Sequence, residues 1–105
     1  MYDEPTFIKE ALRVDFEETA RWRRSEAAEY PEDLRNLEAA ALLDKLAASV
    51  ESIAPDFLDA YGFLWLDFRD SEQHSEMLRQ IGFNYWPKTA EEFVKAYIAN
   101  RSMGA

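Results

Sequence analysis

PEDLRNLEAAALLDKLAASVESI, residues 31–53, is the clearest helical pattern in the chain. Pro31 suits the first turn of a helix, where its missing N–H is not needed. Apolar side chains at helical spacing form one face of the predicted helix: Leu34, Leu37, Ala41, Leu46, Val50 and Ile53. We expect Leu37, Ala41, Leu46 and Val50 to be buried. The run Ala39–Ala41 has little side-chain bulk, so a second helix can approach closely there.

Helical patterns also lie on both sides of this segment. Residues 5–30 carry an apolar stripe at spacings of three and four, made of Phe7, Ile8, Leu12, Phe16, Ala20 and Ala27. Asp15 and Glu18 match a capping box, so a break near Asp15 is an alternative. Residues 55–68 and 71–81 are two further helices, the second with Asp70 as N-cap and Gly82 as C-terminal cap. Thr89 and Glu92 form the capping box of the last helix.

These segments predict an all-α, single-domain bundle of four or five helices. Residues 63–68 are ambiguous, because a short apolar run cannot be assigned by periodicity alone and Gly62 interrupts the pattern. The alternative is therefore an α+β fold, in which residues 63–68 and 83–86 pair as two short strands. We expect one domain over residues 1–105, with a frayed tail at residues 100–105.

Composition limits the classes of function. The 105 residues carry a formal net charge of −9, spread along the chain, which disfavours binding to nucleic acid and to anionic membranes. The chain contains no cysteine, which excludes disulfides and thiolate metal sites. The start of the chain lacks the pattern of a signal peptide, and no apolar run is long enough to span a bilayer. We therefore expect a cytoplasmic protein.

Residues able to do chemistry are sparse. His74 is the only histidine, and Asp70 precedes it by four residues, but one imidazole with one carboxylate is an incomplete catalytic or metal site. We expect His74 on the surface. Arg21 and Arg24 belong to the only basic cluster, a weak candidate for anion binding, and ordinary ion pairs along the helix surface explain this cluster better. The sequence predicts no catalytic residue, no metal ligand and no cofactor, and it favours a protein that is not an enzyme.

The distribution of aromatic residues is more informative. Ten of the 15 aromatics lie between residues 57 and 97, more than a small core needs. We predict a protein-interaction module that uses this aromatic surface for self-association, as a homodimer, or for binding a protein partner. The candidate interface residues are Trp65, Tyr85 and Trp86, of which Trp86 lies in the loop before Thr89. The alternative is a small-molecule-binding or catalytic bundle with a pocket among Tyr61, Trp65, His74, Tyr85 and Trp86.

Overall fold

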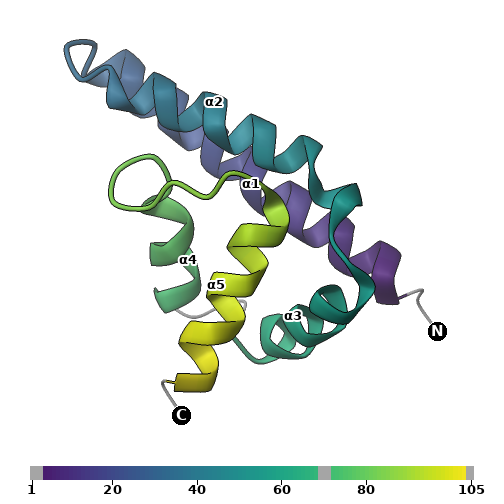
Figure 1. Cartoon of the computed structure of the whole chain (residues 1–105). Coiled ribbons are helices and arrows are strands. Elements are labelled where there is room, and N and C mark those ends of the chain that lie inside the picture. The colour runs from purple at the N-terminus through teal and green to yellow at the C-terminus, as the bar shows by residue number, and fades with distance from the viewer. Residues whose placement is uncertain (1–3, 69–71, 104–105) are drawn as a thin grey trace.

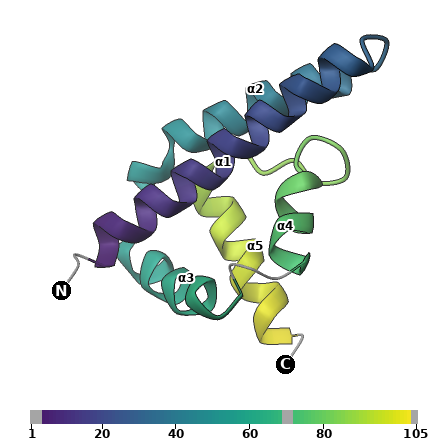
Figure 2. The same cartoon turned by 180° about the vertical axis from the view of Figure 1, so that it is seen from behind.

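The computed structural model describes residues 4–68 and 72–103, and it confirms the all-α bundle. In this part of the chain there are five α-helices, one short 3₁₀ turn and no strand (Figure 1). In chain order the elements are α1 (Glu4–Glu29), α2 (Arg35–Ala48), η1 (Val50–Ser52), α3 (Pro55–Phe68), α4 (Glu72–Arg79) and α5 (Ala90–Met103). α1 and α2 form a long antiparallel hairpin, and α3, α4 and α5 pack against one side of it (Figures 1 and 2).

α1 is one continuous helix, so the predicted alternative of a break near Asp15 is wrong. Asp15 and Glu18 lie inside the helix, and the Thr19 hydroxyl donates to the Asp15 carbonyl at 2.7 Å. The apolar stripe follows the prediction at its centre, where Ile8, Leu12, Phe16 and Ala20 are buried. Arg23 continues this stripe, since it follows Ala20 by three residues and is itself buried.

The predicted buried face of α2 is correct for Leu46 and Val50 and wrong for Leu37 and Ala41. Both of the latter are exposed, and 54% of Leu37 is accessible to solvent. The helix begins at Arg35 instead of Pro31, after a turn in which the Asp33 carboxylate accepts the Arg35 backbone N–H at 3.2 Å. The buried positions are Asn36, Ala39, Ala40, Leu43, Leu46 and Ala47. The true face is thus displaced around the helix from the Leu34–Leu37–Ala41 stripe.

α3 removes the α+β alternative, because Pro55–Phe68 is helical throughout, including Gly62. Gly62 is buried against α1, where a β-carbon would lie 3.2 Å from Ile8 Cγ1, so the missing side chain lets the two helices come close. Residues 83–86 form a turn with a single isolated bridge from Ile81 to Tyr85, and they do not pair with residues 63–68. Gly82 adopts φ +88°, which agrees with its predicted place after the end of α4.

At the starts of α3 and α5, side chains from other parts of the chain accept backbone N–H groups. Ser49 Oγ accepts the backbone N–H of Ala90 at 2.9 Å at the start of α5, and the Glu91 carboxylate accepts the N–H of Ala54 at 2.7 Å just before α3. Thr89 caps α5 as predicted, since its hydroxyl oxygen accepts the Glu92 N–H at 3.2 Å. α5 is helical to Met103, beyond the predicted end at Asn100.

Candidate functional site

His74 is not on the surface, as the sequence predicted, but only 3% exposed. α4 places it against α1 and α5. Its Nε2 lies 3.2 Å from Asp15 Oδ2, and its Nδ1 lies 3.2 Å from the Tyr97 hydroxyl oxygen. A tautomer with its proton on Nε2 suits both neighbours, because Nε2–H then donates to the carboxylate while Nδ1 accepts from Tyr97 O–H. Asp15, His74 and Tyr97 thus form a hydrogen-bonded chain across three helices.

The Tyr97 end of this hydrogen-bonded network is closed to substrates. Tyr97 and Tyr61 are fully buried, and their rings meet edge to face with centres 5.1 Å apart. Burial, reinforced by the charge of Asp15, raises the pKa of Tyr61 well above its ordinary value of 10.0. The Tyr61 hydroxyl has no hydrogen-bond partner among the described residues. A carboxylate, an imidazole and a hydroxyl are in line here, but the hydroxyl has no open side from which to attack a substrate.

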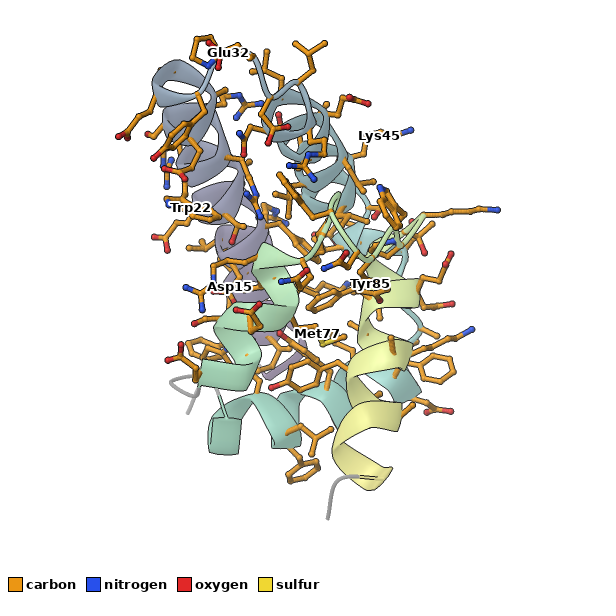
Figure 3. The ribbon with its side chains drawn as sticks, turned by 90° about the vertical axis from the view of Figure 1, so that its left-hand side faces the viewer. Asp15, Trp22, Glu32, Lys45, Met77 and Tyr85 are labelled. Carbon is orange, nitrogen blue, oxygen red and sulfur yellow. The ribbon has the colours of Figure 1, made fainter. Side chains whose placement is uncertain are left out.

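The Asp15 end of the hydrogen-bonded network opens into a pocket of about 320 Å³ between α1 and α4. Its lining residues are Asp15, Glu18, Thr19 and Trp22 from α1, and His74, Ser75, Leu78 and Arg79 from α4. The Asp15 side chain stays 25% exposed although it is held by His74. Figure 3 shows Asp15 where α1 meets α4, with Trp22 farther along α1 toward the hairpin turn. The pocket therefore presents a fixed carboxylate and an aromatic side chain to solvent.

Charges around this pocket are predominantly negative. Its one cation from the described residues, Arg79, already lies 3.6 Å from Glu72 and 3.3 Å from Glu76. No described lysine or arginine pairs with Asp15 or Glu18. The Glu18 carboxylate, and the Asp15 oxygen that does not contact His74, are thus available to a cation from outside.

A buried arginine fixes the end of α4 beside the pocket. The Arg23 guanidinium donates to Asn36 Oδ1 at 3.2 Å and to the Arg79 backbone carbonyl. It also lies over two aromatic rings, 3.9 Å from the centre of Phe83 and 4.4 Å from the centre of Trp22. Desolvation by burial lowers the pKa of Arg23 below its ordinary value, although the nearby charges of Glu26 and Asp33 act to raise it. Arg23 therefore joins α1, α2 and the turn after α4.

The predicted interface residues are not gathered on one surface. Trp65 is buried with its ring edge to face against Phe7, at 5.6 Å between centres. Tyr85 is half-buried and leans over Phe93 at 6.3 Å. Trp86 is 63% exposed, and it borders a second pocket of about 320 Å³ with Arg35, Glu38, Leu42 and Gly82. Of the three, only Trp86 offers most of its side chain to a partner.

The weaker candidates also separate. Arg24 pairs with Asp44 on α2, and Arg21 is exposed on α1. Asp70 lies outside the described residues. The five aromatic and histidine residues of the alternative pocket do not surround a common space, since His74 borders the α1–α4 pocket and Trp86 the α2 pocket, while Tyr61 and Trp65 are buried.

Comparison with known proteins gives no functional lead. No family model, curated protein or solved structure matches this chain. In the described part of the chain, no three histidine or acidic side chains are grouped so that they could hold a metal ion. No helix of that part has the length and apolar character needed to cross a membrane.

The pairing of His74 with Asp15 could not be predicted from the sequence. The two residues are 59 positions apart, and helical periodicity reports only neighbours within one helix. Asp15 does lie on the side of α1 next to the apolar stripe, where a second helix can pack, which is the single local hint. Trp22 is 40% exposed, with the Arg23 guanidinium over its ring.

Proposed function

We propose that the protein is an interaction module that binds a basic protein partner through the half of the molecule that contains the α1–α2 turn. The observation that carries this proposal is that four large apolar side chains of the hairpin and the loop beside α2 are exposed, which together we call the hairpin surface: Trp22, Tyr30, Leu34 and Trp86. Each is 40–64% exposed. Clusters of exposed apolar residues in single-domain proteins commonly mark binding surfaces, and tryptophan is enriched among residues that dominate binding energy.

Charge selects the class of partner. A net charge of −9 repels a second copy of the chain and nucleic acid, and it attracts a cationic protein surface. A protein partner is therefore favoured over the homodimer that the aromatic content alone allowed. The proposal includes a cytoplasmic setting, which the absence of cysteine supports.

The test uses an amphipathic helical peptide of lysine and leucine with one central arginine, and a counterpart in which glutamate replaces every cation. Calorimetry at low salt should detect binding of the basic peptide alone, and the affinity should fall as salt rises. Amide shifts in NMR spectra should map to the hairpin surface.

Matched variants locate the surface. Trp86→Ala should weaken binding about tenfold or more, as expected for an aromatic anchor. Phe63→Ala is the control, because Phe63 is 74% exposed on α3, away from the α1–α2 turn (Figure 1). Equal effects of the two substitutions, or no binding of the basic peptide at low salt, would refute the proposal.

A further inference from the structure

We infer that the pocket between α1 and α4 is the specificity site of this module and receives one arginine side chain of the basic partner. This inference rests on the proposed function and names the group that the partner inserts. It draws on the size of the pocket, the two carboxylates, the exposed indole and the fixed geometry of Asp15.

Size restricts the ligand. At about 320 Å³ the pocket is at the lower end of the range for ligand sites, roughly 300–1,000 Å³. It suits a single side chain and is small for a nucleotide-sized cofactor. It also borders Trp22, which belongs to the hairpin surface, so a partner bound there can reach the pocket without a second contact region.

Charge restricts the ligand further. Asp15 and Glu18 are three residues apart on α1, so both carboxylates lie on the same side of the helix. Arg79, the cation at the opposite wall, already pairs through Nη2 with Glu72 and Glu76. An anionic ligand would meet two carboxylates, whereas a cation gains two acceptors.

The indole of Trp22 favours a planar cation. Arg23 covers one face of the ring at 4.4 Å, and the side chain nevertheless remains 40% exposed and lines the pocket. A guanidinium can stack on an aromatic surface while its N–H groups donate to carboxylates, a combination that the compact ammonium of lysine achieves less well.

The buried hydrogen bonds of His74 and Tyr97 behind the pocket hold the Asp15 carboxylate in place. His74 Nε2 contacts Oδ2 of Asp15, and the Tyr97 hydroxyl in turn holds the other nitrogen of the imidazole. Because Asp15 does not have to be ordered on binding, less conformational entropy is lost when the guanidinium arrives. His74 is accordingly a positioning residue for the pocket.

The experiment compares two peptides with three forms of the whole chain. The first peptide is the basic peptide described above, and in the second its arginine is replaced by citrulline, which keeps the shape and removes the charge. The variants are Glu18→Gln and, as the matched control, Glu17→Gln, which makes the same charge change at an exposed position outside the pocket. Melting curves confirm that each variant is folded.

The unmodified chain should bind the arginine peptide about two- to fivefold more tightly than the citrulline peptide, and Glu18→Gln should abolish that preference. Glu17→Gln should retain it. Trp22→Ala should also reduce the preference, by about two- to fivefold. The Trp22 indole N–H signal should shift with the arginine peptide.

The contrary outcomes are distinct. If the basic peptide binds but Glu17→Gln and Glu18→Gln behave alike, the pocket assignment is overturned and the interaction module stands. If the unmodified chain binds no basic peptide, both are overturned. If free arginine amide binds as tightly as the peptide, the pocket serves a small molecule, and the assignment to a partner's side chain is overturned.

Discussion

Replacing Gly82 by alanine should destabilise the fold by about 2–5 kcal/mol, and two physical causes contribute. The backbone of Gly82 has φ +88°, in the left-handed region, which costs a residue with a side chain about 1–2 kcal/mol. A β-carbon would also lie 2.5 Å from Ala39 Cβ and 2.7 Å from Ala39 Cα, closer than any ordinary contact. Overpacking of this kind costs about 1–3 kcal/mol.

Urea denaturation followed by circular dichroism measures this loss, and Gly62→Ala provides the control. Gly62 has a helical backbone, so alanine gains about 1 kcal/mol of helix propensity there. A β-carbon there would contact only the side chain of Ile8, whose nearest atom Cγ1 lies at 3.2 Å, and this side chain can shift. We expect the two terms nearly to cancel, leaving the free energy of unfolding within about 1 kcal/mol of its original value.

A second-site change separates the steric cause from the backbone cause. Ala39→Gly removes the β-carbon nearest to the new methyl group, so the double variant should lose less stability than the sum of the two single variants. The contact with Ala39 Cα and the left-handed backbone remain, so the recovery is partial. A loss below about 1 kcal/mol for Gly82→Ala, or strictly additive effects, would show that the turn does not press on α2 in this way.

Three further predictions concern the core and its polar groups. Leu46→Ala should cost about 2–5 kcal/mol because the side chain is fully buried, whereas Leu37→Ala should cost under about 1 kcal/mol; equal losses in urea denaturation would contradict the described face of α2. Tyr61→Phe should be neutral or stabilising, because it removes a buried hydroxyl that has no partner among the described residues. Tyr97→Phe should cost about 0.5–1.5 kcal/mol, because the hydrogen bond to His74 is lost. A larger loss for Tyr61→Phe than for Tyr97→Phe in thermal unfolding would contradict the described network. Burial raises the pKa of Tyr85 to about 12, so the neutral side chain contributes its full stability below pH 10.0 and this contribution should be lost as the pH rises through 12. A Tyr85→Phe variant should lack this loss, and the same dependence of stability on pH in both proteins would contradict the prediction.

The sequence predicted the helices well and the face of one of them poorly. Leucine occupies position 34 just before α2 and positions 37, 42, 43 and 46 within it, so two apolar stripes overlap on one helix. The prediction chose the stripe with Leu37, but the alanines on the other side let α1 and Gly82 approach more closely. Because close packing depends on the shapes of both partners, a single helix sequence could not decide between the stripes.

Candidate site residues were harder to predict for a related reason. Trp65 and Trp86 are both aromatic residues in apolar segments, yet one is buried against Phe7 and the other is 63% exposed. His74 was predicted on the surface, because Asp70 is the only carboxylate three or four residues from it in the sequence. Its actual partner comes from another helix, and no local spacing encodes such a contact.

The order of the helices along the chain has a consequence for the growing polypeptide. α1 and α2 are synthesised before α3, α4 and α5 and can join at once, because only a short turn separates them. Phe16 on the hairpin then stays uncovered until Phe93 of α5 has been synthesised and can pack against it. During that interval the nascent hairpin exposes the apolar side chains that α5 later covers.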